Sequence, residues 1–384
     1  MSAKKCRVRA SRDSRVLMLV PYPAIQGPLP KIVPLLVDSL RALGCDIETE
    51  HWRRHADNAS LLRKVAGRAG VLRHIHARLR PRRFDVVFII SAHNGVGLTR
   101  DIPLVLAIGR VCRRRLIQFH GSYSDHLNVP GHALLKFASR ALVRACDAVL
   151  VSSQEERDEW TSFYPKGRFE VVANAFSPEL VGSSDAHRTS EPGDARTTGP
   201  QYRSGSPTLL YVGRLMPEKG VFDLLQAKAQ VVGQVPCRLL VVGDGASAQA
   251  LVRMAEKFGI AGSVEMLGHV SEPRLARCYA EADALVLPSY REGFPTVLLE
   301  AMSAGLPLVT TRLRGAADRL EEGVHVLFVP PWHPATLAEA LIRVLTDDEL
   351  RTSMAVNNVA KVREFAPNVV APQYLAILES VVDT

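Results

Sequence analysis

The sequence predicts an α/β protein built from two doubly wound, Rossmann-like domains that face a central cleft. A chain of 384 residues exceeds the roughly 100–200 residues of most single domains, so we expect two hydrophobic cores. In both halves, short runs of Val, Ile and Leu alternate with helix-sized amphipathic segments, an order typical of parallel sheets covered on both faces. Ligands of such sheets bind beyond the carboxyl ends of the strands, so the cleft is the expected site.

The first domain is predicted over residues 1–181. Apolar residues at helical spacing between Ile32 and Leu43 predict a helix, and Gly44 is a typical helix stop. Buried parallel strands are predicted from apolar runs that are too short for buried helices. The expected strands are 15–20, 85–91, 116–120, 148–152 and 170–173.

The second domain is predicted over residues 207–365, after a flexible linker at 182–206. The linker is rich in Gly, Ser, Thr, Pro and charge and has almost no large apolar side chain. A final helix is expected to pack back on the first domain, to which residues 366–384 are assigned. The expected strands of the second domain are 208–212, 238–242, 264–267, 284–287, 308–311 and 326–329.

The composition is that of a globular protein without a membrane span. Apolar residues make up 47% and charged residues 23%, which excludes disorder over most of the chain. The apolar runs are shorter than the roughly 20 residues that a bilayer requires. The run at 16–20 is too short for a signal sequence, and the six cysteines are dispersed without close pairs. We therefore expect a cytoplasmic protein with neither a disulfide framework nor a zinc site.

Positive charge is concentrated in the first half. Residues 1–190 carry 30 Lys and Arg against 17 Asp and Glu, whereas residues 191–384 carry 18 against 22. The stretch 53–83 contains ten basic residues and one acidic residue, Asp57. Such a stretch attracts polyanions or an anionic membrane surface, and a solvated Arg-rich helix face is the alternative.

A candidate diphosphate site follows the predicted strand 208–212. The chain continues as Gly213-Arg214, and Lys219 follows five residues after the arginine. A glycine turn that carries an Arg and a Lys places two cations at the carboxyl end of a strand, where a diphosphate could bind. The next strand ends in Gly243-Asp244-Gly245, where glycines permit a ligand to approach the backbone or serve only the turn.

The most informative segment is residues 288–307, PSYREGFPTVLLEAMSAGLP. A helix is predicted from about Pro295 to Ala304, with Gly305 as its stop. The amides of its first turn form an anion site. Glu292 lies in the preceding loop and Glu300 within the helix, so the two carboxylates could contact opposite ends of one ligand. An anion site beside hydroxyl-binding carboxylates is typical of a nucleotide-sugar binder.

These motifs together resemble the second domain of the retaining glycosyltransferases of family 4, also called group 1 glycosyltransferases, which adopt the GT-B fold. The resemblance covers roughly residues 207–350 and is weaker before them. Four motifs occur in the order and at the spacing of the family. They are Gly213-Arg214 with Lys219-Gly220, Gly243-Asp244-Gly245, Leu267-Gly268-His269-Val270, and Glu292 with Glu300 around Glu-Gly-Phe-Pro.

The resemblance implies a role for each matched residue. Arg214 and Lys219 would bind the donor diphosphate and stabilise it as a leaving group. Glu292 would contact hydroxyls of the donor sugar, and Glu300 the ribose. His120, at the end of a first-domain strand, would touch the sugar or the attacking group. The remaining donor-binding positions that the resemblance implies are Gly213, Gly243, His269, Val270, Gly293, Phe294, Pro295, Thr296 and Val297.

The activity that the resemblance implies is transfer of a hexosyl-type sugar from a UDP- or GDP-linked donor to an acceptor hydroxyl with retention of configuration. The acceptor would be a glycan or a lipid-linked glycan, bound mainly by the first domain at the inner face of the cell membrane. No cofactor and no metal are expected, because two cations and a helix N-terminus can stabilise the leaving group. Nucleic acid is not expected, because Tyr123 and Trp160 do not form a stacking series.

Two alternatives remain open at the level of sequence. A non-catalytic nucleotide-sugar-binding subunit would retain Arg214, Lys219 and Glu300 without turnover. It is favoured by the loop 21–30, which has one glycine and four prolines where the family has a glycine-rich loop. A sugar-nucleotide epimerase would share the GT-B architecture, but no further acid–base carboxylate pair is evident.

Overall fold

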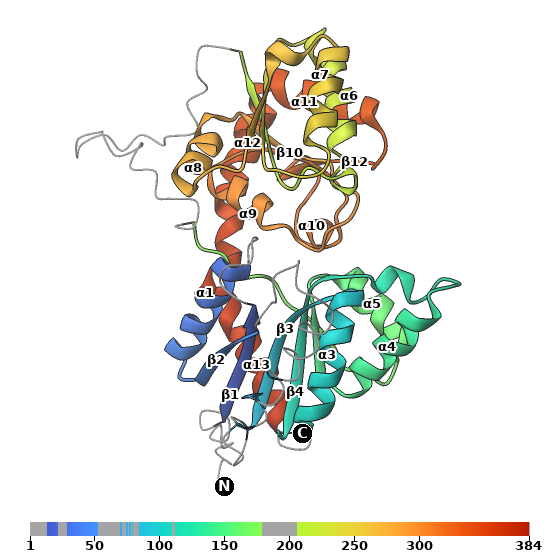
Figure 1. The fold of residues 1–384 in the computed structure, drawn as a ribbon. Coiled ribbons are helices and arrows are strands. Elements are labelled where there is room, and N and C mark those ends of the chain that lie inside the picture. The colour runs from blue at the N-terminus through green and yellow to red at the C-terminus, as the bar shows by residue number, and fades with distance from the viewer. Residues whose placement is uncertain are drawn as a thin grey trace, which may run out of the picture. The chain divides into compact units, whose positions relative to one another are not determined.

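The computed structural model describes residues 14–21, 29–52, 84–109, 112–178 and 206–383, with single positions between 70 and 79. The chain forms two compact units (Figure 1). The first comprises residues 1–175 and 366–384, and the second residues 176–365. The basic stretch 53–83 and the linker 182–206 lie almost entirely outside the described residues, as does most of the proline-rich loop 21–30.

The predicted α/β fold class is confirmed. In the described part of the first unit, six parallel strands form a sheet in the order β2-β1-β3-β4-β5-β6. The strands are β1 Arg15–Pro21, β2 Asp46–Trp52, β3 Val86–His93, β4 Arg114–Ser122, β5 Ala148–Val151 and β6 Phe169–Val171. The helices are α1 Leu29–Ala42, α3 Gly95–Ile108, α4 Ala133–Arg144, α5 Gln154–Phe163 and α13 Pro367–Val382, with a short 3-10 helix η1 at Ser124–His126.

The strand β2 was not predicted, because its sequence, DIETEHW, contains no apolar run. It pairs with β1 alone and forms an edge of the described sheet. Ile47 is its buried apolar residue, while Asp46 is exposed and Glu48 and Glu50 are half-buried. An edge strand needs little apolar surface, so a search for runs of Val, Ile and Leu misses it.

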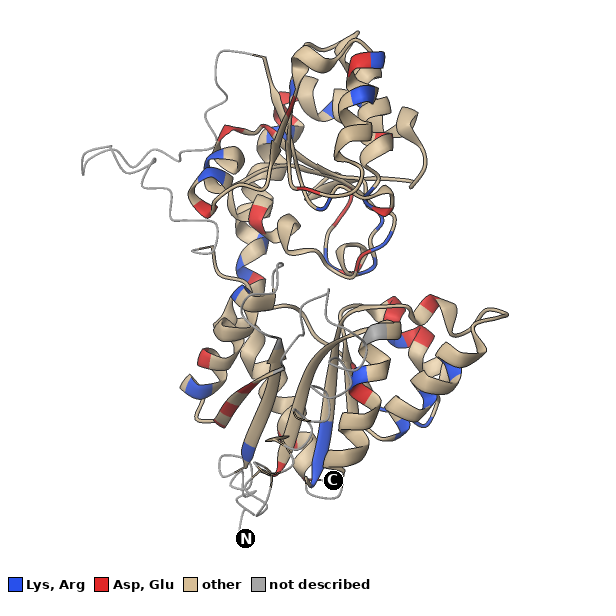
Figure 2. Ribbon diagram, in the orientation of Figure 1, with Lys and Arg blue, Asp and Glu red and all other residues tan. Residues whose placement is uncertain are grey.

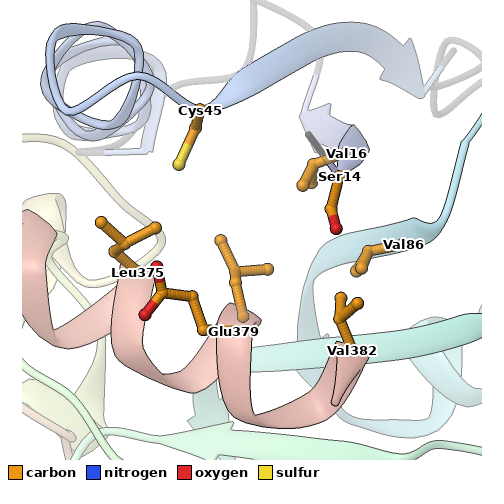
Figure 3. Close-up of a pocket in the computed structure, with 8 residues that line it drawn as sticks. Ser14, Val16, Cys45, Val86, Leu375, Glu379 and Val382 are labelled. Atoms are coloured by element: carbon orange, nitrogen blue, oxygen red, sulfur yellow. The ribbon is translucent and has the colours of Figure 1, made fainter. Parts of the chain in front are cut away.

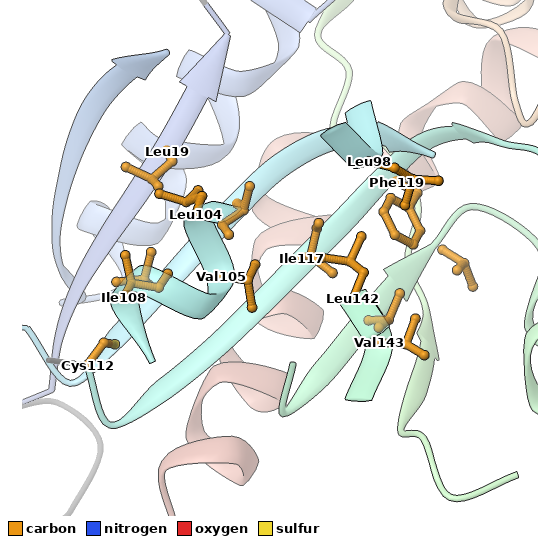
Figure 4. Packing of buried hydrophobic residues seen from close by; sticks show 14 of the residues in the cluster. Leu19, Leu98, Leu104, Val105, Ile108, Cys112, Ile117, Phe119, Leu142 and Val143 are labelled. Carbon is orange, nitrogen blue, oxygen red and sulfur yellow. The ribbon is translucent and has the colours of Figure 1, made fainter. Parts of the chain in front are cut away.

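The core of the first unit lies between the sheet and the helices α3, α4 and α5 (Figure 4). Leu19, Ile89 and Ile117 point to this face from three neighbouring strands. The indole of Trp160 on α5 is fully buried and stacks on the ring of Phe119, at 5.5 Å between centroids. This packing fixes the carboxyl end of β4, which carries His120.

The other face of the first sheet is covered by α13 and α1 (Figure 1). The amide of Gln118 on β4 donates to the hydroxyl of Tyr374 on α13 at 2.7 Å, and this hydroxyl donates to the carbonyl of Ala173 at 3.2 Å. The last helix therefore lies against the first sheet. A shallow pocket beside α13 is lined mainly by apolar residues such as Val16 and Val86, together with Ser14, Cys45 and Glu379 (Figure 3).

The second unit repeats the doubly wound plan. Its six described strands are parallel, in the order β12-β11-β10-β7-β8-β9. They are β7 Thr208–Val212, β8 Arg238–Val242, β9 Val264–Gly268, β10 Ala284–Leu287, β11 Leu308–Thr311 and β12 Val326–Val329. The helices are α6 Val221–Val232, α7 Ala248–Lys257, α8 Glu272–Glu281, α9 Thr296–Ser303, α10 Arg314–Ala317, α11 Pro334–Thr346 and α12 Asp348–Lys361.

The strand order of the second unit reverses between β7 and β10. From β7 the chain first adds β8 and β9 on one side, and then places β10, β11 and β12 on the other. Loops that leave neighbouring strands at such a reversal point diverge to opposite faces of the sheet and leave space for a ligand. The residues that follow β7 and β10 are therefore the best placed for a site.

The contact between Tyr374 and the first sheet can be tested by removing one hydroxyl. Tyr374→Phe leaves the buried Gln118 amide without its acceptor, so we expect the free energy of unfolding to fall by about 1–3 kcal/mol in urea denaturation. Tyr164→Phe is the control, because no hydrogen bond of the Tyr164 hydroxyl is found among the described residues. Equal stability of the two variants would show that the Gln118–Tyr374 bond does not hold α13 in place.

Candidate active site

The predicted donor residues follow four neighbouring strands of the second sheet. Arg214 follows β7, Gly243 follows β8, His269 follows β9, and Glu292 follows β10. Because these strands are parallel and adjacent, their carboxyl ends lie at one edge of the sheet. Figure 2 shows acidic and basic residues interspersed along the loops at this edge.

The turn after β7 is built on close contact between backbones. A Cβ atom at Gly243, where φ is +132°, would lie 1.9 Å from the carbonyl oxygen of Gly213, so only glycine fits. The carbonyl of Arg214 accepts a hydrogen bond from the Tyr211 hydroxyl at 3.0 Å, while the Arg214 side chain is exposed. Burial, and secondarily Glu292, raises the pKa of Tyr211 far above its ordinary value, so this hydroxyl stays a donor. The turn is thus fixed while its guanidinium remains accessible.

Lys219 and Glu292 form an ion pair across the reversal point. The Lys219 Nζ lies 2.8 Å from Glu292 Oε1, and the side chains are only 14% and 19% exposed. The Ser289 hydroxyl donates to the same oxygen at 2.8 Å. A Cβ atom at Gly220, where φ is +66°, would lie 2.0 Å from the carbonyl oxygen of Pro288, so this glycine allows the loops after β7 and β10 to touch. Two residues expected to contact different parts of the donor are therefore in direct contact with each other.

The helix α9 runs from Thr296 to Ser303, within the predicted range, and Gly305 follows with φ of +71°. Pro295 is its N-cap, with extended backbone, rather than its first helical residue as the sequence suggested. The N-cap residue makes no capping hydrogen bond through its side chain, and the first amides of the helix, which include those of Thr296 and Val297, have no intrahelical acceptor. They form a potential anion site beside Glu292.

The loop before α9 is held by the ring of Phe294. This buried ring contacts the Phe365 ring at 5.1 Å between centroids, and the Arg319 guanidinium lies over it at 5.6 Å. The carbonyl of Gly293 accepts a hydrogen bond from the amide of Gly315 at 2.9 Å. In the structure, Phe294 therefore anchors the loop that carries Glu292.

Glu300 is held by a buried tyrosine from α8. The Tyr279 hydroxyl donates to Glu300 Oε2 at 2.6 Å, and Tyr279 is 1% exposed. Burial, and secondarily the Glu300 charge, keeps the pKa of Tyr279 well above its ordinary value. The Tyr279 hydroxyl thus remains a donor that fixes one oxygen of the Glu300 carboxylate. The Glu300 side chain as a whole is half-buried.

The segment after β9 carries the residues expected to face a nucleotide base. His269 is exposed and Val270 is half-buried. The amide of Gly243 donates to the carbonyl of Gly268 at 2.8 Å, which joins this segment to the turn after β8. The structure therefore places His269 and Val270 beside Gly243 at the same edge of the sheet.

His120 lies in the first unit, near the carboxyl end of β4. The residue as a whole is half-buried, but its Nε2 atom is buried and has no hydrogen-bond partner among the described residues. Burial lowers the pKa of His120 to about 4, so the ring is neutral at neutral pH. A neutral imidazole with an unpartnered nitrogen can accept or donate one hydrogen bond to a ligand.

A second histidine, which the sequence did not single out, holds the segment after His120. His93 at the end of β3 is 1% exposed, and its Nδ1 accepts from the amide of Tyr123 at 3.2 Å. Its Nε2 therefore carries the proton and donates to the Ser139 hydroxyl at 2.7 Å. A histidine that directly follows an apolar strand is the signal that could have found it. Tyr279 and Ser289 gave no comparable signal, because their partners depend on tertiary contacts.

Comparison with known proteins finds relatives among glycosyltransferases. Residues 199–360 match the family described as glycosyl transferases group 1. Glycogen synthase of Mycobacterium tuberculosis is 32% identical over 261 residues, which cover 67% of this chain and 58% of that protein. The aligned part thus spans less than two thirds of that relative.

Solved structures match over almost the whole chain. Sucrose-phosphate synthase of Thermosynechococcus elongatus superimposes with a TM-score of 0.75 at 19% identity, covering 96% of this chain and 99% of that one. Anabaena HepE, solved in complex with UDP-glucose, has a TM-score of 0.67 at 18% identity, covering 96% and 100%. At these identities the likeness shows the fold.

The two doubly wound sheets, with cations and carboxylates gathered at a reversal point of the second, define an α/β protein of the GT-B fold. Over residues 199–360 the chain is similar to the group 1 glycosyltransferase family. Among the residues that the structure describes, no helix is long and apolar enough to span a bilayer.

The buried state of His120 predicts a pH effect on stability. An unfolded histidine titrates near pH 6.5, whereas the folded His120 titrates near pH 4. Between these values the unfolded chain binds more protons, so the contribution of His120 is complete above about pH 6.5 and is lost as the pH falls toward 4. We expect the melting temperature of His120→Gln to fall less steeply than that of the wild type over this window. The exposed His333, changed to Gln, is the control. If the melting temperatures of wild type and His120→Gln fell in parallel as the pH is lowered, this would contradict the lowered pKa of His120.

Proposed function

We propose that the protein transfers a glycosyl group from a nucleotide-diphosphate sugar to an acceptor hydroxyl with retention of configuration and without a metal ion. The observation that carries the proposal is the convergence of Arg214, Lys219 and the N-terminus of α9 at the reversal point of the second sheet. The family match and the UDP-glucose complex of HepE support the choice of donor. UDP- and GDP-linked sugars are the donors to test.

The arrangement suits a diphosphate leaving group. As the glycosidic bond breaks, negative charge grows on the diphosphate and positive charge on the sugar. Arg214 is exposed and available to a phosphate, and the first amides of α9 point away from the helix body toward the same edge. Without a donor, Lys219 is neutralised by Glu292. When a diphosphate takes Lys219, the Glu292 carboxylate is released to bind sugar hydroxyls. Glu300, oriented by Tyr279, is placed to accept hydrogen bonds from ribose hydroxyls.

The first unit is proposed to bind a glycan or lipid-linked acceptor through the segment around His120. His120 offers a neutral nitrogen at the carboxyl end of β4, the edge at which ligands of doubly wound sheets bind. Because its ring stays neutral, it can contact a sugar without adding charge to the reacting centre.

Turnover can be tested with a donor panel. Wild-type protein is incubated with UDP- and GDP-sugars, and release of nucleoside diphosphate is measured with and without candidate acceptors. We expect Arg214→Ala to lower kcat about 10²–10³-fold, because one electrostatic contact to the leaving group is lost. Glu300→Gln should lower turnover mainly through a higher KM for the donor.

The controls separate catalysis from folding and binding. Arg238→Ala removes an exposed arginine from the opposite end of β8 and should leave turnover unchanged. Unfolding curves of all variants should coincide with that of the wild type. Donor binding without turnover by the wild type would instead favour the non-catalytic subunit, and conversion of the donor sugar without transfer would favour the epimerase.

We further propose that the protein works at the cytoplasmic face of an anionic membrane. The concentration of Lys and Arg in residues 1–190 supports this. On α4 the side chains of Leu134 and Phe137 are 81% and 74% exposed, and Arg140 and Arg144 are exposed on the same helix. Figure 2 shows basic residues along α4. Apolar side chains beside arginines are typical of a helix that lies on anionic lipid.

Vesicle sedimentation tests this proposal. We expect binding to phosphatidylglycerol vesicles, little binding to phosphatidylcholine vesicles, and weaker binding as salt rises, because the attraction is screened. Phe137→Asp should reduce binding, since it replaces an exposed apolar side chain by a charge of the same sign as the lipid. Val252→Asp, at an exposed apolar position on α7 of the second unit, is the control. No binding, or binding that salt does not weaken, would refute the membrane proposal.

A further inference from the structure

Trp332 has a backbone conformation that its side chain does not favour. Its φ is 58°, in the left-handed region, where bulky residues are rare and glycine is preferred. Its side chain is nevertheless 65% exposed, so little apolar surface is removed from water in return. A strained residue persists where the surrounding structure holds it, and such residues cluster at ligand sites.

The indole of Trp332 is held by a second aromatic ring. It lies against Tyr290, with ring centroids 4.5 Å apart and planes inclined by 34°. The Tyr290 hydroxyl donates to Asp223 Oδ2 at 3.0 Å, and the Tyr290 amide donates to the carbonyl of Glu218 at 3.0 Å. Burial and the Asp223 carboxylate raise the pKa of Tyr290 to about 12, so its hydroxyl stays protonated. Tyr290 is thus a fixed support for the indole.

The aromatic pair is continuous with the candidate donor site. Tyr290 precedes Glu292 by two residues, and the residue that accepts its amide hydrogen bond, Glu218, directly precedes Lys219. Trp332 follows β12, so it lies at the same edge of the sheet as the donor residues. It lies on the side away from β8 and β9, because β12 is two strands beyond β10, or about 10 Å along the sheet.

The surroundings of the indole suit an uncharged, hydroxyl-rich ligand. A shallow pocket beside it is lined by prolines and by Asp223, Thr311 and His333. The face of an indole carries partial negative charge and attracts the polarised C–H groups of a pyranose ring. A ring held rigidly before binding also loses little conformational entropy when the ligand arrives.

We propose that the Trp332–Tyr290 pair is a stacking platform for a pyranose ring of the glycan acceptor. The proposal rests on the proposed glycosyl transfer and adds a specificity-determining contact in the second unit. The acceptor is the assigned ligand because Trp332 follows β12, on the side of β10 away from the donor groups that follow β7, β8 and β9. Trp332 would select acceptors long enough to reach from the reacting hydroxyl to this edge strand.

A glycan microarray tests the proposal with the full-length protein. We expect the labelled wild type to bind at least one oligosaccharide, Trp332→Gly to lose that signal at least tenfold, and Trp332→Tyr to retain a substantial part of it. Glycine adopts the left-handed backbone without strain, which should stabilise the variant, whereas loss of the contact between the two rings should destabilise it. The two effects on stability therefore oppose each other. The melting temperature of Trp332→Gly should therefore change by no more than about 4 °C. Phe258→Ala, at an exposed aromatic residue that ends α7, is the matched control and should bind as the wild type does.

A parallel thermal-shift measurement with UDP-glucose and GDP-mannose separates this proposal from the proposed function. The platform is supported if the donor raises the melting temperature of wild type and Trp332→Gly equally, while only the variant loses glycan binding. Absence of glycan binding by the wild type, or equal glycan binding by wild type and Trp332→Gly, overturns it. Loss of the donor shift in Trp332→Gly also overturns it, because Trp332 would then bind the donor. Absence of any donor shift in the wild type counts against the proposed function, while the array still decides on the platform.

Discussion

The candidate site depends on the ion pair between Lys219 and Glu292. Their loops leave β7 and β10, the two strands between which the sheet order reverses, and they touch because Gly220 lets its backbone approach Pro288. Two side chains less than one-fifth exposed would each be costly to bury unpaired. Pairing removes most of that cost and holds a cation and a carboxylate ready at one point. In the proposed function, a diphosphate that displaces the carboxylate would obtain the cation and free an acceptor for hydroxyl groups.

The surrounding residues orient this pair rather than take part in it. Ser289 fixes the bonded oxygen of Glu292, and Tyr279 fixes one oxygen of Glu300. Phe294 anchors the loop between them by packing on Phe365. Both hydroxyl donors are buried, so each of these hydrogen bonds holds one carboxylate oxygen in a fixed position. The second unit thus combines a rigid sheet edge with a few groups that a ligand can rearrange.

Most of the fold could be predicted from the sequence, whereas the roles of the candidate site residues stay predictions from its motifs. Strands of both sheets and the helices α9 and α13 follow from apolar runs and from glycine and proline stops, which are local signals. The polar edge strand β2 escaped, because its stability comes from pairing with β1 rather than from its own apolar residues. The motifs located Lys219 and Glu292, but their contact depends on strand order. No role could be predicted for Tyr279, because its partner Glu300 lies 21 residues away in the sequence. None could be predicted for Trp332, because its left-handed backbone leaves no local sequence pattern.

The displacement of Glu292 by a diphosphate can be measured by isothermal titration of UDP and GDP into wild type, Glu292→Gln and Lys219→Met. If the carboxylate competes with the diphosphate for Lys219, the nucleoside diphosphate that the wild type binds should bind several-fold more tightly to Glu292→Gln and more weakly to Lys219→Met. Weakening of similar size in both variants would contradict the competition.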